Sequence, residues 1–101
     1  MKTTTMNDTK RQVQRSSAFK RDYKRAKKQG KNINLLLEII ENLANDNTLE
    51  PKHKDHALRG EWSGFRECHI TPDWLLVYQK ENDGELILCL ARLASHSELD
   101  F

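Results

Sequence analysis

The sequence predicts a single α+β domain in which two N-terminal helices pack on an antiparallel β-sheet of about four strands. Residues 18–46 contain two runs with apolar side chains at helical spacing, whereas residues 61–93 contain three short runs rich in aliphatic and aromatic residues. This change of period along the chain is typical of helices followed by a sheet. At 101 residues, the chain is long enough for one modest core.

The first elements are a tail, a short strand and a helix. Residues 1–12 are polar and unpatterned, so we expect a flexible N-terminal tail and a single domain over 13–101. The sequence QVQRS is compatible with a short first strand. Ser16 or Ser17 caps the first expected helix and Gly30 ends it. The side chains expected to face the core are Phe19, Tyr23 and Ala26.

The second expected helix has the sequence INLLLEIIENLAND, with Asn32 as its cap. Its apolar spacing predicts one face that lies on the sheet, made by Ile33, Leu36, Leu37, Ile40 and Leu43. A long polar linker, NTLEPKHKDHALRG, then leads to the strands and contains two of the four histidines. Long loops of this kind often carry function.

Three strands follow the linker, within EWSGFRECHI, DWLLVYQK and ELILCLARL. The turn residues 81–84 separate the last two strands and predict antiparallel pairing. The apolar residues of those two strands are continuous rather than alternating, which indicates central strands covered on at least part of both faces.

Charge is segregated along the chain although the net charge is only +2. Ten of the seventeen Lys and Arg residues lie within residues 10–31, where the only acid is Asp22, and residues 32–50 carry four acids and no Lys or Arg. Such a basic segment is typical of nucleic-acid binding, and a solvated helix face is the alternative. The lysines that form a stripe on the first helix are Lys20, Lys24, Lys27, Lys28 and Lys31.

The composition argues against several other classes. No apolar run approaches the roughly 20 residues that span a bilayer, and the first residues lack the apolar region of a signal peptide, so we expect a cytoplasmic protein without a membrane partner. Cys68 and Cys89 are interpreted as small buried hydrophobes rather than a disulfide. A zinc site is not favoured, because Cys68 and His69 are strand neighbours that point to opposite faces.

Residues 55–74 concentrate titratable and aromatic side chains. Histidines exchange protons near neutral pH, so His56, His69 and His96 are candidates for acid–base chemistry if the fold brings them together. Asp73 and Trp74 add an acid and a stacking surface, which suits cleavage of a phosphodiester beside a base. The structural alternatives are a tryptophan in the core, an aspartate that caps a turn, and an Arg66 paired with a nearby glutamate.

The segment KDHALRGEWSGFRECHITPDWLLVYQ, the later SHSEL and the early FKRDYKRAKKQG together resemble the YafQ branch of the RelE-like toxins. These toxins are ribosome-dependent endoribonucleases of bacterial type II toxin–antitoxin pairs. The resemblance covers roughly residues 13–101 and implies a RelE-like, microbial-RNase-type fold. It assigns catalytic roles to His56, His69, Asp73 and His96.

The resemblance also implies how the substrate is held. Trp74 would hold a base or the mRNA backbone, and Phe101, one position further from His96 than is usual in the family, is the second stacking candidate. Lys54 and Arg66 would add positive charge near the scissile phosphate, together with Lys52. The lysine stripe on the first helix would contact ribosomal RNA.

The implied reaction is metal-independent cleavage of mRNA in the ribosomal A site by the RNA's own 2′-OH, with no cofactor. His96 would be the general acid, and Asp73 or His56 the base. The implied partners are the 70S ribosome with its mRNA and a ribbon-helix-helix antitoxin similar to DinJ or RelB, with operator DNA bound only through the antitoxin complex. The alternative is a catalytically inactive domain of this fold that binds RNA or the antitoxin.

Overall fold

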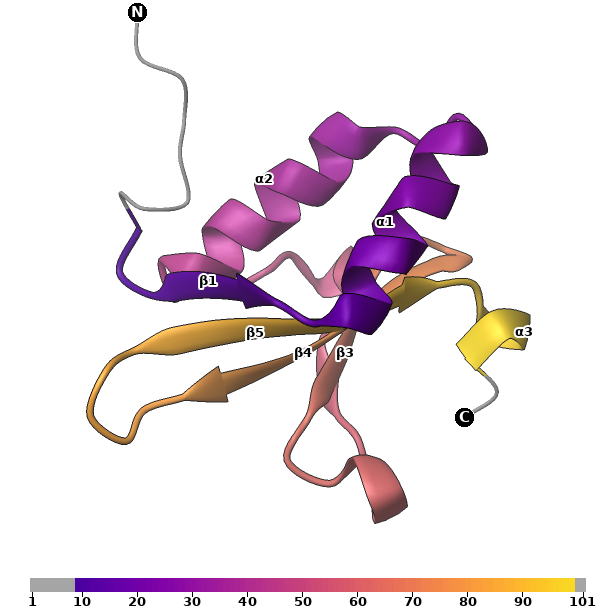
Figure 1. Cartoon of the computed structure of the whole chain (residues 1–101). Helices are drawn as coiled ribbons and strands as arrows, with labels where there is room; N and C mark the ends of the chain where they lie inside the picture. The colour runs from indigo at the N-terminus through magenta and orange to yellow at the C-terminus, as the bar shows by residue number, and fades with distance from the viewer. Residues whose placement is uncertain (1–8, 100–101) are drawn as a thin grey trace, which may run out of the picture.

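The computed structural model describes residues 9–99, which form a five-stranded sheet with two helices on one face (Figure 1). The strands are β1 (Gln12–Arg15), β2 (His56–Ala57), β3 (Arg66–Thr71), β4 (Trp74–Glu81) and β5 (Ile87–Ala94). The helices are α1 (Ser17–Lys28), α2 (Ile33–Ala44) and α3 (His96–Leu99), with 3₁₀ turns η2 (Pro51–His53) and η3 (Gly60–Trp62). The predicted α+β class is confirmed.

The sheet differs from the prediction in strand number and direction. Its order is β1-β5-β4-β3-β2, and β1 pairs with β5 in parallel, whereas the other neighbours are antiparallel. The sheet is therefore mixed and has five strands rather than about four. The additional strand, β2, lies in the predicted linker and has only two residues, too few for a periodic pattern.

The folded part begins before the predicted domain boundary. Gln12 is the first residue of β1, and Arg11 is 7% exposed. The Arg11 guanidinium donates to Asp46 at 2.7 Å and to Asn82 at 2.6 Å, so it joins the end of α2 to the β4–β5 turn. Residues 11 and 12 thus belong to the domain and not to the tail. Residues 1–8 of the predicted tail lie outside the described residues.

The helix α1 forms as the sequence predicts. Ser16 is the N-cap, and its hydroxyl accepts a hydrogen bond from the backbone N–H of Phe19 at 2.9 Å. Phe19 and Ala26 are buried in the core, and Tyr23 is half-buried against it. Gly30 has a φ of +78°, a conformation that glycine adopts without a steric penalty, and the helix ends before it.

The helix α2 is rotated relative to the predicted apolar face. Asn32 caps it as expected, but Leu37 is 39% exposed and Ile39 is 5% exposed. The helix contacts both β3 and β5, so its buried side is shifted from the predicted face and includes Ile39 instead of Leu37. The residues that α2 buries are Leu36, Ile39, Ile40, Leu43 and Ala44.

The sheet carries apolar clusters on both faces. The larger cluster lies between the sheet and the helices α1 and α2, and it includes Leu76 and Leu90. The smaller cluster lies on the opposite face, where Leu75, Val77 and Leu99 are packed by the loop before β3. We call this second surface the open face. No helix within residues 9–99 is both long and apolar enough to cross a membrane.

Asp22, the only acid within residues 10–31, joins α1 to the last strand. It is 3% exposed, and its carboxylate accepts hydrogen bonds from Arg92 Nε at 2.7 Å and from the backbone N–H of Leu93 at 2.9 Å. Arg25 Nη2 donates to the same carboxylate at 3.0 Å. Burial alone would raise the pKa of Asp22, but the hydrogen bonds from Arg92 and Leu93 outweigh it and lower the pKa below 3.8.

We expect Asp22→Asn to lower the free energy of unfolding at pH 7 by about 2–3 kcal/mol, because Arg92 and Arg25 lose their charged partner while Arg92 remains partly hydrated. The folded-state pKa of Asp22 is depressed, so its contribution is fully present above the unfolded value and is lost as the pH falls below about 4. Urea unfolding followed by tryptophan fluorescence measures both effects.

Asp83→Asn, in the exposed turn between β4 and β5, is the matched control and should change stability little. Equal stability of the Asp22 and Asp83 variants at pH 7 would contradict this account of Asp22.

Candidate active site

The open face receives every second side chain of β3. Cys68 and Ile70 belong to the core under the helices, so Glu67 and His69 point to the opposite side of the sheet. A β-strand imposes this alternation, and it separates two sets of residues that are mixed in the sequence. The candidate site is therefore built on the face that α1 and α2 leave free.

Two of the predicted histidines lie on either side of Glu67. His56 is paired opposite Glu67 across β2 and β3, with its Nε2 3.4 Å from Glu67 Oε1. The Nε2 of His69 is 4.0 Å from the same oxygen. Glu67 is 6% exposed, so its carboxylate is a buried anion held between two imidazoles. The sequence indicates Glu67 only as a partner of Arg66, and its place between the two histidines depends on the pairing of β2 with β3.

The backbone fixes the tautomer of His56. Its Nδ1 lies 2.7 Å from the carbonyl oxygen of Lys54, and a carbonyl only accepts hydrogen bonds. Nδ1 therefore donates, and Nε2 is the nitrogen that gains or loses a proton beside Glu67. Lys54 provides this carbonyl from a left-handed conformation with φ of 48°. Lys54 thus contributes to the site through its backbone, whatever its side chain binds.

The other two predicted residues form a direct pair. His96, the first residue of α3, donates through Nδ1 to Asp73 Oδ1 at 2.9 Å, and its backbone N–H donates to the same oxygen at 3.1 Å. The imidazole rings of His96 and His69 are in contact, with centroids 5.3 Å apart. The four residues predicted to be catalytic are thus brought together with Glu67 in one row, in the order His56, Glu67, His69, His96 and Asp73.

The pairing with His96 perturbs the Asp73 carboxyl. The side-chain hydrogen bond from His96, followed by the backbone hydrogen bond, lowers the pKa of Asp73 below its usual value of 3.8. Asp73 is thus an anion at neutral pH. A carboxylate on Nδ1 fixes the ring orientation and leaves Nε2 of His96 to face a substrate.

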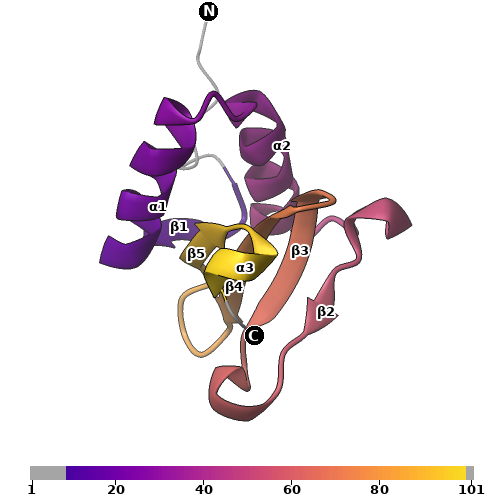
Figure 2. The ribbon, with the colours of Figure 1, turned by 90° about the vertical axis from the view of Figure 1, so that its right-hand side faces the viewer.

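The short helix α3 holds His96 in place through its neighbours. Glu98 accepts the backbone N–H of Ser95 at 2.9 Å, which lowers the pKa of Glu98, and it forms an ion pair with Arg25 of α1 at 3.5 Å. Leu99 packs into the open-face cluster. Figure 2 shows α3 in front of β4, with α1 to one side of it and β3 to the other. The position of His96 therefore depends on α1 as well as on the sheet.

The structure places Arg66 away from the row of histidines. Arg66 is opposite Tyr78 on the neighbouring strand and points to the other side of the sheet from Glu67 and His69. Its partner is Asp55, at 3.3 Å, which also accepts the Tyr78 hydroxyl at 2.6 Å. The expectation that Arg66 lies near the scissile phosphate is therefore corrected, because strand alternation turns it to the opposite face.

Trp74 is also removed from the set of substrate-stacking candidates. It is 3% exposed and belongs to the core under the helices, with the ammonium of Lys31 5.9 Å from the centre of its ring. A ring buried in this way has no free face for a base. The structural alternative, a core tryptophan, is the correct one.

The remaining predicted residues lie on the surface or outside the described part. The lysines of α1, namely Lys20, Lys24, Lys27 and Lys28, are all exposed. Lys27 also lies over the ring of Tyr23, 5.7 Å from its centre. Phe101 lies outside the described residues. Among residues 9–99 no group of three or more His, Cys, Asp and Glu side chains is arranged to hold a metal ion.

Comparison with known proteins gives the family. A sequence model of YafQ, the bacterial toxin of type II toxin–antitoxin systems, matches residues 11–100. The mRNA interferase toxin YafQ of Escherichia coli K12 is 33% identical over 90 residues, covering 88% of this chain and 95% of that protein. The chain belongs to the YafQ toxin family. The predicted resemblance is confirmed, and the homologues are mRNA interferases, a class of endoribonuclease.

Solved structures of YafQ-family toxins share the fold. The E. coli DinJ–YafQ toxin–antitoxin complex contains a chain with 33% identity and a TM-score of 0.80, covering 89% of this chain and 97% of that one. A metal-bound toxin from Helicobacter pylori has 47% identity and a TM-score of 0.80, covering 86% of this chain and 96% of that one. The YafQ neighbours have the RelE-like fold, as expected.

We expect His96→Ala to raise the pKa of Asp73 toward 3.8, because the two hydrogen bonds from His96 are the main stabilisers of the carboxylate and only the weaker backbone bond remains. A pH titration of the side-chain carboxyl carbons by NMR measures the change. Asp46, whose pKa is lowered to about 2 by Arg11 and Lys80, is the internal reference and should not move. An unchanged Asp73 titration would contradict the pairing.

Proposed function

We propose that this YafQ-family chain is the toxin of a type II toxin–antitoxin system that cleaves mRNA in the ribosomal A site. The observation that carries the proposal is the row of three imidazoles and two carboxylates on the open face, in which each residue contacts the next. Two separated proton-transfer groups with a third imidazole between them suit attack by a 2′-OH on the adjacent phosphorus. The names of the homologues support the same activity.

His96 is the general acid in this mechanism. Its Nδ1 is bound to the Asp73 carboxylate, so the ring that donates a proton from Nε2 is an imidazolium stabilised by an anion. The proton passes to the 5′-oxygen as the phosphorus–oxygen bond breaks. Asp73, which the sequence left as a candidate base, is then the group that orients and stabilises His96.

His56 is the general base. Its Nδ1 donates to a backbone carbonyl, so Nε2 is available to accept the proton of the 2′-OH as the new phosphorus–oxygen bond forms. The buried Glu67 carboxylate, 3.4 Å from that nitrogen, stabilises the imidazolium that results. His69, between the two, contacts the phosphoryl oxygens. The products are a 2′,3′-cyclic phosphate and a 5′-hydroxyl, and the proton balance requires no metal or cofactor.

The positions of the cations support the proposed dependence on the ribosome. Arg66 points away from the histidines, and the α1 lysines lie in the helix layer on the other side of the sheet. The site therefore has fewer fixed cations to hold free RNA than the sequence suggested, and ribosome binding through α1 compensates by delivering the mRNA.

A cognate antitoxin is the second partner. The E. coli YafQ toxin has been solved in complex with DinJ, and a similar ribbon-helix-helix protein is proposed for this chain. An acidic disordered segment of such a protein would bind the basic surface of α1 and cover the open face. Operator DNA would be bound only through that complex.

We expect a bell-shaped pH profile for single-turnover cleavage of mRNA on ribosomes. His96→Ala should lower the rate at least about 100-fold and remove the alkaline limb, since that limb reports loss of the acid's proton. His56→Ala should lower the rate and remove the acidic limb, since that limb reports protonation of the base. Mapping of new 5′ ends within A-site codons measures the rates.

His53→Ala is not a suitable control because its ring contacts β3, so Asp83→Asn in the β4–β5 turn is used. A His96→Ala rate within about threefold of wild type would exclude His96 as the acid. Ribosome binding by the wild type without cleavage would favour the inactive RNA-binding domain instead.

We expect the triple variant Lys20→Gln, Lys24→Gln, Lys28→Gln to bind ribosomes more weakly and with a smaller dependence on salt, because fewer phosphate counterions are released. The rate of mRNA cleavage on ribosomes that have bound the toxin should not change. Sedimentation binding at several salt concentrations measures the effect, and Lys10→Gln, an exposed lysine outside α1, is the control. An unchanged salt dependence would locate the ribosome contact elsewhere.

A further inference from the structure

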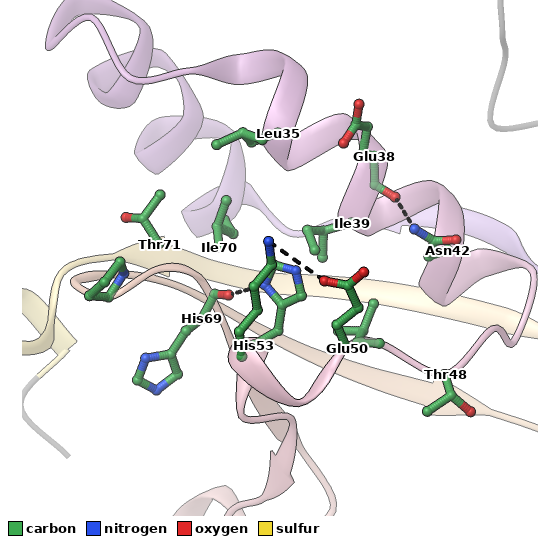
Figure 3. A pocket seen from close by; sticks show the side chains of 13 residues that line it. Leu35, Glu38, Ile39, Asn42, Thr48, Glu50, His53, His69, Ile70 and Thr71 are labelled. Carbon is green, nitrogen blue, oxygen red and sulfur yellow. Dashed lines mark hydrogen bonds and ion pairs between the residues drawn. The ribbon is translucent and has the colours of Figure 1, made fainter.

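A cleft of about 640 Å³ lies on the other side of β3 from the row of histidines, between α2, η2 and the end of β3 (Figure 3). Its volume is in the range of small-ligand sites and is large for a domain of this size. The end of β3 and the residue after it provide one wall, residues 69–72, and this segment carries His69 and leads directly to Asp73. The cleft is not used by the proposed chemistry.

The cleft has an apolar wall of a kind that stacks against flat rings. Leu35, which is 37% exposed, provides most of the accessible surface of this wall, because Ile39 and Ile70 are each only 5% exposed. No element within residues 9–99 covers this leucine fully. Figure 3 shows the three side chains around one side of the opening, with Glu38 and Glu50 at its rim.

The polar groups of the cleft are mostly hydrogen-bond acceptors. Glu38 and Glu50 contribute carboxylates, and Lys52 is 3.6 Å from Glu50 with its side chain 72% exposed. Asn42 uses its amide nitrogen to donate to the backbone carbonyl of Glu38 at 3.1 Å. The donors that line the cleft are the ammonium of Lys52, which is paired with Glu50, and the hydroxyls of Thr48 and Thr71.

His53 adds a further acceptor and links the cleft to the active site. Its Nδ1 lies 2.7 Å from the carbonyl oxygen of His69, and because a carbonyl only accepts, Nδ1 donates. The neutral ring of His53 therefore has an acceptor at Nε2, on the far side of the ring from β3. The same hydrogen bond ties η2 to the residue that carries a catalytic imidazole.

An RNA chain can reach both sites around the turn that follows β3. The strand β2 pairs only with Arg66 and Glu67, and His53 of η2 covers the edge of β3 at His69. Along β3, His69 points to the open face and Ile70 points to the cleft. Thr71 and Pro72 line the cleft and the next residue, Asp73, holds His96, so this turn joins the two sites.

We propose that this cleft is a base subsite that takes an adenine, cytosine or guanine of the bound RNA in preference to uracil. Each of the three favoured bases has an exocyclic amino group that donates to a carboxylate, whereas uracil offers one N–H between two carbonyl acceptors. Two carboxylates repel a phosphate, but they accept hydrogen bonds from an uncharged base that stacks on the apolar wall. This proposal rests on the proposed function, because the base belongs to the RNA that the active site cleaves.

The first test measures binding without cleavage. The protein carries labelled isoleucine methyl groups and is titrated with 2′-O-methyl trinucleotides, which lack the nucleophile and differ only in base. Trinucleotides of adenine, cytosine or guanine should shift the Ile39 and Ile70 methyl signals and bind at least about fivefold more tightly than the uracil trinucleotide. Glu38→Gln, which replaces one acceptor by an amide, should reduce this preference to about twofold or less.

Glu41→Gln is the matched control, because Glu41 lies on the same helix and does not line the cleft. This variant should retain the wild-type preference. Unshifted Ile39 and Ile70 methyl signals, equal binding of the uracil trinucleotide, or equal preferences in the Glu38 and Glu41 variants would each overturn the proposal. Shifts caused by a lysine-rich peptide and by no nucleotide would also overturn it, and would make the cleft a protein-docking groove.

The second test separates this proposal from the proposed function. Sites of cleavage on translating ribosomes are mapped for wild type, Glu38→Gln and Glu41→Gln, and the base next to the cut is scored. Loss of discrimination against uracil only in the Glu38 variant supports the subsite, and an unchanged base preference overturns it. Base-selective methyl shifts without any cleavage would refute the nuclease function while leaving the subsite in place.

Discussion

Asp22 binds Arg92 and the backbone of Leu93 from the first helix, and through Arg25 it is connected to Glu98 of α3. These contacts join residues about 70 positions apart and place α1, β5 and α3 relative to one another. Since α3 begins with His96, the position of the proposed acid depends on a carboxylate in the helix layer that never meets the substrate. The core under the helices is the larger of the two apolar clusters, and this network fixes α1 against β5.

The sheet separates two kinds of surface. The helix layer on one face presents the exposed lysines of α1, and the open face presents imidazoles and carboxylates. In the proposed function, electrostatic attraction to RNA and proton transfer are therefore carried by different residues on different sides of the molecule. The open face keeps its imidazoles beside anions rather than beside the arginines of the chain, an arrangement that favours proton exchange over tight binding of phosphate.

Local features of the structure could be predicted from the sequence, and those that depend on long-range pairing could not. The caps Ser16 and Asn32 and the three long strands follow from short-range rules. The family resemblance named His56, His69, Asp73 and His96, and the fold brings them together.

The errors have a common physical cause. Whether Trp74 or Arg66 faces the core depends on the strand register, and a single position reverses the side. The burial of Asp22 and the role of Glu67 depend on partners that are distant in the sequence, or on a strand of two residues that has no pattern of its own.

The strand β1 also has a consequence for biosynthesis. It is among the first elements to be translated, but its partner, β5, begins only at Ile87, so a nascent chain carries an unpaired N-terminal strand and an unanchored α1 until the last strand emerges. The sheet is therefore completed late in translation, and a nascent chain still bound to the ribosome that makes it is not yet a folded toxin.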